Sequence, residues 1–396
     1  MCLAGVMPLV CTPWREDIFY DGKIVFAAVI TGLYALIRLF LKPEISWRPL
    51  ENIEWILVTY VLLVLLSTAF SIDRGSSIWG QPYVREGMGS LVLYVVIFYL
   101  FYKEFKVSEK TLGAVLICVA IVSMYGILQY YKIAGGAEAL VRGGWEQRMS
   151  TVGSRNFAGT YSMLFLPIAC GLYLYKQHLL GLLSALVLFA LLMATQTRST
   201  WIALVVCMTL FFVFSLRTKS MLKRWGILML LFAAIFGIMD YTQEQKDKLS
   251  NRAKTVVSDA QNIQKDSAGS NRIFYWKRTL PLLFERPWLG SGPDTYGHVM
   301  RNEYGKIHLH YPKAHNEYLQ MLITLGWPAT IVYMMLVVLV LFRIVTRIKK
   351  GPLQQILFCC ITGYLIQAFF NISVISTAPI FWAMLGIGAR LHGETK

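Results

Sequence analysis

Histidine side chains gather in one stretch of an otherwise apolar chain. Four of the six histidines lie within residues 298–315. The last of them, His315, is followed by Asn316 and by an apolar run that continues to Trp327. A neutral imidazole with an ordinary pKa of about 6.5 can accept a proton at neutral pH, so His315 is a candidate general base. The same positions also suit a structural role, with Asn316 as the N-cap of a helix and His315 as an anchor at its end.

Three of these histidines have a second interpretation, as ligands of zinc. His308, His310 and His315 could place imidazoles on one side of an extended segment, and zinc accepts such ligands. The pattern supplies no fourth ligand, and Pro312 interrupts it. We therefore expect neither a metal nor any other cofactor, and we keep a zinc hydrolase as an alternative.

Arginine side chains supply candidate binding sites for an anion. Arg198 stands in "ATQTRSTW", a short connection between two apolar runs, so its guanidinium must lie at or just below a membrane surface. A charge costs up to about 3 kcal/mol at the centre of a bilayer and less near its edge, and an anionic partner would offset that cost. The alternative is an arginine that only extends its charged end to the interface.

Arg272 is the corresponding candidate in a long polar segment. It lies one turn before Trp276, near the start of a helix that we expect to run toward Arg286, and the start of a helix favours a phosphate. The nearby "GSGPD" lacks the spacing of a nucleotide-binding loop, so we predict no ATP site. Further polar residues are candidate substrate contacts, although the first two suit a capped helix equally well: Arg155, Asn156, Arg278, Arg301 and Asn316.

These residues must be positioned by helices that cross a membrane. The chain has 396 residues, of which 56% are hydrophobic and 15% charged, with a mean hydropathy of +0.53. Apolar runs of about 17 to 25 residues, the length that an α-helix needs to cross ~30 Å of hydrocarbon, recur along the chain. We predict one all-α polytopic membrane domain, 1–396, with about 11–12 transmembrane helices. The predicted crossings are 24–41, 53–70, 88–102, 111–131, 157–175, 179–195, 199–216, 225–240, 318–342, 355–371 and 374–391, and an apolar stub, Leu3 to Cys11, is a shortened first helix.

Charge sets the orientation of these helices. The connections 217–224 and 343–350 each carry four basic residues and no acidic residue, which is typical of cytoplasmic loops. Alternation then places 132–156, 196–198 and the long segment 240–316 on the outer side, and the C-terminus in the cytoplasm. The net charge of +16 suits anionic lipid head groups or an anionic substrate. Nucleic acid is not an expected partner, because no base-reading module accompanies the charge.

Four motifs follow one another on the predicted outer side. They are "VGSRNFAGTYSMLFLP", "TQTRSTW", "RIFYWKRTLPLLFERPWLGSGPDTY" and "HNEYLQMLITLGW". Together they resemble the O-antigen ligase and O-antigen polymerase superfamily, over about residues 150–330 in motif and over the whole chain in topology. The resemblance implies a glycosyltransferase of the multi-spanning C type, in which the large outer loop, 240–316, contains short helices and part of the active site.

The resemblance also implies a reaction. Such enzymes take a glycan from a polyprenyl-diphosphate carrier, such as undecaprenyl diphosphate, on the outer face of the bacterial cytoplasmic membrane. They pass it to a hydroxyl of a glycan, a lipid or a protein. Arg198 matches the family's arginine in the short outer turn and His315 its histidine at the end of the large loop. Arg272 best matches the arginine within that loop, with Arg278 and Arg301 as substitutes.

The mechanism that these residue types support agrees with that reaction. Two arginines would neutralise the diphosphate, which is already a good leaving group. His315 would take the proton of the attacking hydroxyl, and displacement would invert the anomeric carbon without a metal. The sequence does not separate ligation, polymerisation and transfer to a protein, because all three share the donor chemistry. A transporter of lipid-linked glycan for the cell envelope is the alternative, because it also needs many helices and basic groups.

Overall fold

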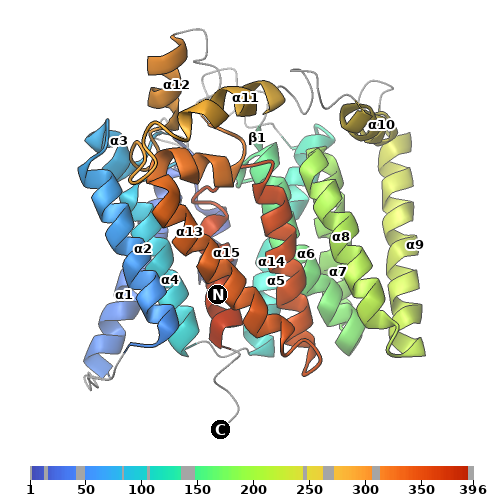
Figure 1. Ribbon diagram of the computed structural model, residues 1–396. Helices are drawn as coiled ribbons and strands as arrows, with labels where there is room; N and C mark the ends of the chain where they lie inside the picture. Colours follow the sequence, from blue (N-terminus) through green and yellow to red (C-terminus); the bar gives the residue numbers. More distant parts are fainter. Residues whose placement is uncertain are drawn as a thin grey trace. The chain divides into compact units, whose positions relative to one another are not determined.

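The structure of the protein is a computed structural model, drawn in Figure 1. It describes residues 2–12, 17–41, 50–82, 84–104, 108–134, 148–243, 248–261, 272–305 and 313–390. Helices make up nearly all of the regular structure in these ranges. Two short strands, β1 (Arg148–Met149) and β2 (Gly153–Ser154), form an antiparallel pair. The prediction of an all-α fold is confirmed.

Each of the eleven predicted crossings corresponds to a helix. The helices are α1 (Asp21–Leu41), α2 (Asn52–Ala69), α4 (Met88–Glu104), α5 (Glu109–Tyr130), α6 (Arg155–Lys176), α7 (Leu179–Thr195), α8 (Arg198–Ser215), α9 (Lys219–Tyr241), α13 (Glu317–Val345), α14 (Pro352–Ala368) and α15 (Ala378–Arg390). Within the described ranges, six of them are long and apolar enough to cross a membrane, namely α2, α5, α6, α8, α9 and α13. The chain is therefore a polytopic membrane protein, while the number of 11–12 crossings stays a prediction.

Shorter helices connect these long ones. The stub at the start of the chain forms a π-helical turn, η1 (Cys2–Val6), and a 3-10 turn, η2 (Met7–Leu9). Helix α3 (Arg74–Trp79) follows α2. As expected, the segment 240–316 contains short helices, which are α10 (Leu249–Gln261), α11 (Arg272–Leu282) and α12 (Tyr296–Tyr304).

The chain divides into two compact units, each described here by itself. Unit 1 consists of Met1–Phe19, Lys106–Asn262 and Ile344–Gln367. Unit 2 consists of Tyr20–Phe105, Ile263–Arg343 and Ala368–Lys396. The segment 240–316 contributes to both, because α10 belongs to unit 1 whereas α11 and α12 belong to unit 2. The single domain 1–396 stays a prediction.

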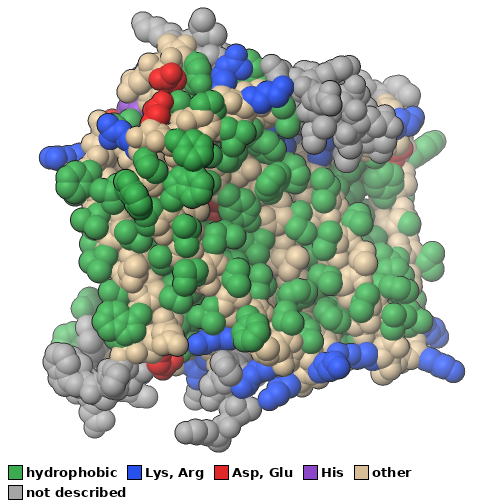
Figure 2. Space-filling model, viewed as in Figure 1, with side chains coloured by type: hydrophobic (Ala, Val, Ile, Leu, Met, Phe, Trp, Pro, Cys, Tyr) green, Lys and Arg blue, Asp and Glu red, His purple; other side chains and the backbone are tan. Residues whose placement is uncertain are grey.

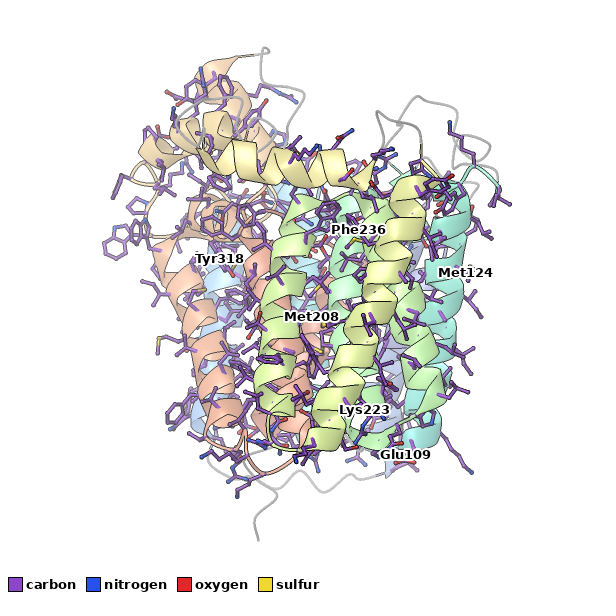
Figure 3. All side chains as sticks on the ribbon, turned by 90° about the vertical axis from the view of Figure 1, so that its right-hand side faces the viewer. Glu109, Met124, Met208, Lys223, Phe236 and Tyr318 are labelled. Carbon is purple, nitrogen blue, oxygen red and sulfur yellow. The ribbon has the colours of Figure 1, made fainter. Side chains whose placement is uncertain are left out.

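Small residues let the helices of unit 1 pack closely. A Cβ atom on Gly171 of α6 would lie 2.4 Å from Ile356 of α14. The rings of Phe189 on α7 and Phe232 on α9 stack with centroids 4.1 Å apart. Small side chains at helix contacts allow the backbones to approach, which is how helices associate in a membrane. Helix α10 lies across the ends of α8 and α9 (Figures 1 and 3).

Basic side chains lie at both ends of α8. Arg198 begins α8, and the exposed Arg217 and Lys219 follow its other end. Lys223, in the first turns of α9, lies at the end of that helix away from α10 (Figure 3). Basic side chains line this edge of the surface below a field of hydrophobic ones (Figure 2). The apolar length of both helices therefore separates Arg198 from the basic connection that we predict to be cytoplasmic.

Aromatic side chains fill the core of unit 2. Trp382 of α15 lies among Tyr60, Tyr94 and Tyr333, with ring centroids 5.7 to 6.3 Å from its own. A Cβ atom on Gly386 would lie 2.4 Å from the carbonyl oxygen of Phe98, so this glycine lets α15 approach α4 closely. Large aromatic groups contribute much of the buried apolar area in such a core.

Helix α13 is broken at Gly326, and the break holds the segment before α12 in place. Gly326 has a non-helical conformation, φ 80° and ψ 173°, and Pro328 lacks the N–H group that would bond to the carbonyl of Thr324. That carbonyl instead accepts a hydrogen bond from the backbone N–H of Gly292 at 2.8 Å. A proline and a glycine thus release a helix carbonyl for the connecting segment.

A second exchange of backbone hydrogen bonds completes the attachment. The N–H of Trp327 donates to the carbonyl of Pro287 at 2.8 Å rather than to its own helix. The carbonyl of Ile323, freed in this way, accepts from the N–H of Ser291 at 2.9 Å. Gly290 has a φ of 65°, and a Cβ atom on it would lie 2.5 Å from the α13 backbone. The segment 286–292 is therefore fastened to the first half of α13.

Candidate active site

The turn that carries Arg198 is defined by local hydrogen bonds in unit 1. Gln196 ends α7 in a left-handed conformation, φ 52°, and Thr197 precedes α8. The hydroxyl of Thr197 donates to Oδ1 of Asn156 at 3.4 Å. The hydroxyl of Thr200 donates to the carbonyl of Thr197 at 2.6 Å. Arg198 is thus the first residue of α8, and its side chain is partly buried at the helix end.

A third arginine reaches this turn from α10. Nε of Arg252 donates to the carbonyl oxygen of Gln196 at 3.1 Å. The charge of Arg252 interacts with those of Arg198 and Arg155. Burial lowers the pKa of Arg252, and the charge of Arg155 lowers it further. We define Arg155, Arg198 and Arg252 as the arginine cluster; an anion bound among them would remove their mutual repulsion.

Arg155 and Asn156 are also the first two residues of α6. The hydroxyl of Ser154 accepts a hydrogen bond from the N–H of Phe157 at 3.3 Å and caps the helix. The carbonyl of Asn156 accepts from Nε2 of Gln367 at 3.3 Å. The capped-helix alternative is confirmed, and contacts of Arg155 and Asn156 with a substrate stay predictions.

An apolar groove runs along α7, α8 and α9 in the same unit. Its volume is about 500 Å³, and it is lined by side chains that include Met193, Trp201, Met208, Phe232 and Phe236. Figure 3 labels Met208 on α8 and Phe236 on α9. Trp201 follows Arg198 by three residues on α8, so one end of the groove lies one helical turn from the arginine cluster.

His315 lies in unit 2, immediately before α13. Its backbone is left-handed, φ 48°, which is uncommon for a residue other than glycine. The backbone N–H and the carbonyl oxygen of the neighbouring Ala314 are both hydrogen-bonded. Its N–H donates to Oε1 of Gln320 at 3.1 Å, and its carbonyl accepts from Nε1 of Trp276 at 3.0 Å. The partly buried imidazole is therefore carried by a fixed backbone.

Asn316 caps α13. Its Oδ1 accepts a hydrogen bond from the N–H of Leu319 at 3.0 Å, and only 2% of the residue is exposed. The helix-capping interpretation of Asn316 is confirmed. Its contact with a substrate stays a prediction.

Helix α11 brings one of the predicted loop arginines to His315. Arg272 begins this helix, and its charge acts on the imidazole. Arg278 instead stacks on the ring of Phe274, with its guanidinium carbon 3.5 Å from the ring centroid. Arg301 is exposed on α12. The geometry of unit 2 thus favours Arg272 over both substitutes as the arginine that acts beside His315.

The surroundings of His315 keep its imidazole neutral. Burial, together with the charges of Arg272 and Lys313, lowers the pKa of His315 from 6.5 to about 4. The ring therefore carries no charge at pH 7, which is the state required of a base.

A group of buried charges lies close to this segment and was missed in the sequence. Lys313 and Asp294 form an ion pair, with 4% and 3% of each residue exposed. Glu86 is also buried and accepts a hydrogen bond from the hydroxyl of Tyr94. Burial raises the pKa of Glu86 to about 7, although that hydrogen bond opposes the shift. A cavity of about 50 Å³ lies among Asp294, Glu86 and Glu317.

The structure assembles the predicted residues in two groups. Arg155, Asn156 and Arg198 meet in unit 1, and Arg272, His315 and Asn316 meet in unit 2. The pairing of Arg198 with Arg272 stays a prediction.

The zinc alternative depends on two histidines that lie outside the described residues, His308 and His310. In the ranges that the structure describes, no three His, Cys, Asp or Glu side chains are arranged to hold a metal ion.

The fold and these residues define an all-α, polytopic integral membrane protein with polar side chains held at the ends of its helices. Residues 183–334 match the family model of O-antigen ligase. The matched segment includes Arg198, Arg252, Arg272 and His315, and the match agrees with the resemblance that the sequence motifs indicated.

A curated relative extends the similarity. The chain is 24% identical over 347 residues to the General O-oligosaccharyltransferase of Acinetobacter baylyi, an alignment that covers 82% of this chain and 57% of that protein. The chain therefore spans little more than half of the length of this relative.

Proposed function

We propose that the protein is a glycosyltransferase of the bacterial cytoplasmic membrane. It takes a glycan from a polyprenyl-diphosphate carrier and transfers it to a hydroxyl acceptor on the outer face. The observation that carries this proposal is the arginine cluster at one end of unit 1, two of whose members lie in the segment matched to O-antigen ligase. A diphosphate suits this cluster, because guanidinium groups bind phosphate oxygens through paired, charge-assisted hydrogen bonds.

The apolar groove supports a lipid-linked donor. It begins one turn from Arg198 and follows α8 and α9, both long enough to cross a membrane. A polyprenyl chain attached to the diphosphate would extend from the cluster along this groove, where burial of its apolar surface is favourable. A soluble sugar nucleotide has no apolar chain that could be buried in such a groove.

His315 is the proposed general base. The bond between the anomeric carbon and the diphosphate breaks as the acceptor oxygen attacks from the opposite side, which inverts the configuration. The proton of the hydroxyl moves to the imidazole, which is neutral at pH 7 because of its lowered pKa. Arginine side chains would stabilise the leaving diphosphate, so neither a metal nor ATP is required.

Deleting the gene tests the proposal. Mass spectrometry of surface and carrier-linked glycans should show that a carrier-linked glycan accumulates in the deletion strain. Loss of long chains would define a polymerase, accumulation of carrier-linked polymer a ligase, and loss of glycan from proteins a protein O-glycosyltransferase. Unchanged glycans on every carrier and acceptor would contradict the proposal.

The transporter alternative has its own test. Purified protein in vesicles would receive an undecaprenyl-diphosphate-linked oligosaccharide. If the oligosaccharide crossed the bilayer but formed no glycosidic bond with any added acceptor, the transferase assignment would fail.

A further inference from the structure

The described residues next to His315 are held by hydrogen bonds and by a buried ion pair. Lys313 precedes His315 by two residues and donates to the carboxylate of Asp294. An ammonium group taken out of water needs such a partner, because an unpaired buried charge is strongly unfavourable. The pair therefore determines where the chain must lie just before the histidine.

Asp294 joins three parts of unit 2. Its carboxylate accepts hydrogen bonds from the backbone N–H groups of Gln81 and Glu86, as well as from Lys313. It has a left-handed φ of 59°, and it follows the segment 286–292 that is fastened to α13. The connection between α3 and α4, the connection before α12 and the segment before α13 thus meet at one side chain.

The backbone of His315 depends on these attachments. A left-handed conformation is unfavourable for a residue with a Cβ atom and persists only when the surroundings impose it. Lys313 fixes the chain before His315, Ala314 is bonded to Trp276 and Gln320, and the cap of α13 fixes the chain after it. Without the ion pair, the first of these constraints is lost and the imidazole can turn away.

We propose that Lys313 and Asp294 are positioning residues for His315, whose buried ion pair holds the imidazole in the orientation from which it takes the acceptor proton. This inference rests on the proposed function of His315. The competing explanation is a pair that only stabilises the fold. Proton transfer distinguishes the two, because a displacement of about 1 Å can lower a reaction rate about 100-fold while binding is retained.

The experiment compares Lys313→Met, Asp294→Asn and the double variant in full-length protein reconstituted in vesicles. Turnover of an undecaprenyl-diphosphate-linked oligosaccharide, its KM and the thermal midpoint are measured for each. We expect each single variant to lower kcat about 10- to 100-fold with a change in donor KM below about threefold. The double variant buries no unpaired charge, so its thermal midpoint should recover while kcat stays low.

A readout independent of turnover accompanies these rates. Diethyl pyrocarbonate acylates neutral imidazoles, and mass spectrometry reports the pH dependence of the reaction at His315. Lys313→Met should raise the apparent pKa of His315, because it removes a nearby positive charge and loosens the buried segment. Asp73→Asn is the matched control, since Asp73 is a carboxylate of unit 2 that caps α3 and should leave both readouts unchanged.

The possible outcomes separate this inference from the proposed function. If His315→Asn abolishes turnover but the double variant turns over like the wild type, the positioning role is wrong and the base survives. If kcat follows the thermal midpoint in all three variants, the pair only stabilises the fold. If His315→Asn itself retains turnover, the base is wrong and the inference fails with it.

Discussion

The arginine cluster of unit 1 and residues 313–316 of unit 2, here called the histidine segment, are held in different ways. Near Arg198, the hydroxyl of Thr197 donates to Asn156, and Arg252 donates to the carbonyl oxygen of Gln196. The three positive charges of the arginine cluster interact at this site. Around His315 a buried ion pair, a helix cap and two bonds to Ala314 fix consecutive residues. One site gathers positive charge, and the other restricts a backbone.

This difference matches two different demands of a transfer reaction. Binding a diphosphate requires positively charged groups, and the bound anion offsets the repulsion among them. Proton transfer needs fixed geometry more than charge. Substitutions in the arginine cluster should therefore change donor affinity, and substitutions in the histidine segment should change turnover.

The largest effect should come from His315. His315→Asn removes the base but tolerates the left-handed backbone better than alanine would. We expect kcat to fall by about 100- to 10,000-fold, with donor affinity within about twofold of the wild type. His298→Ala is the control, because His298 is a partly exposed histidine of the same unit that bonds to Gln81 at 2.8 Å. Equal losses in the two variants would remove the special role of His315.

Arg198 should show the opposite pattern. Arg198→Ala removes charge-assisted hydrogen bonds worth about 1.5–3 kcal/mol, so the dissociation constant for undecaprenyl diphosphate should rise about 10- to 150-fold. Arg198→Lys keeps the charge but cannot form paired hydrogen bonds. Its dissociation constant should therefore lie between those of the wild type and of Arg198→Ala. Arg217→Ala, at the other end of α8, is the control. Loss of turnover with unchanged affinity would break the contrast between the two sites.

Arg252 should have a smaller effect of the same kind. Its removal takes away one positive charge but also relieves repulsion of Arg155 and Arg198. We expect affinity for undecaprenyl diphosphate to fall by up to about fivefold, as for partly exposed charge pairs, and to depend less steeply on salt. Lys254→Ala is the control, because Lys254 is an exposed basic residue of the same helix. Tighter binding in Arg252→Ala would exclude Arg252 from the anion site.

The sequence was sufficient for the long helices and for part of the site. The length of an apolar run is a local property, and each predicted crossing therefore coincides with a helix. Asn316 was placed correctly at a helix start for the same reason, and Arg198, predicted in the connection before 199, is the first residue of α8. The family motifs were confirmed over residues 183–334.

The sequence was insufficient where distant segments meet. Arg252 reaches the turn at Gln196 only because α10 lies across α8, and its own surroundings give no sign of this. Lys313 and Asp294 are ordinary charged residues in the sequence and become partners only when the segment 286–292 docks on α13. Gly326 and Pro328 could have predicted the break in the helix. They could not predict which residues bond to the backbone groups that the break frees.

The smallest expected effect concerns pH: kcat/KM of the wild type should not fall as the pH is lowered to about 5.5. A histidine with an ordinary pKa of about 6.5 would be about 90% protonated at pH 5.5 and lost as a base. Burial beside Arg272 and Lys313 lowers the pKa of His315 to about 4, so the neutral ring should persist as the pH falls through 6.5. The acidic limb of kcat/KM should therefore lie well below pH 6.5. Lys313→Met should move it upward, because a positive neighbour is removed, whereas Arg217→Ala should leave it in place. A limb at pH 6.5 in the wild type would show that burial and the neighbouring charges do not keep the imidazole neutral, and the contrast between a fixed base and an anion-binding arginine cluster would disappear.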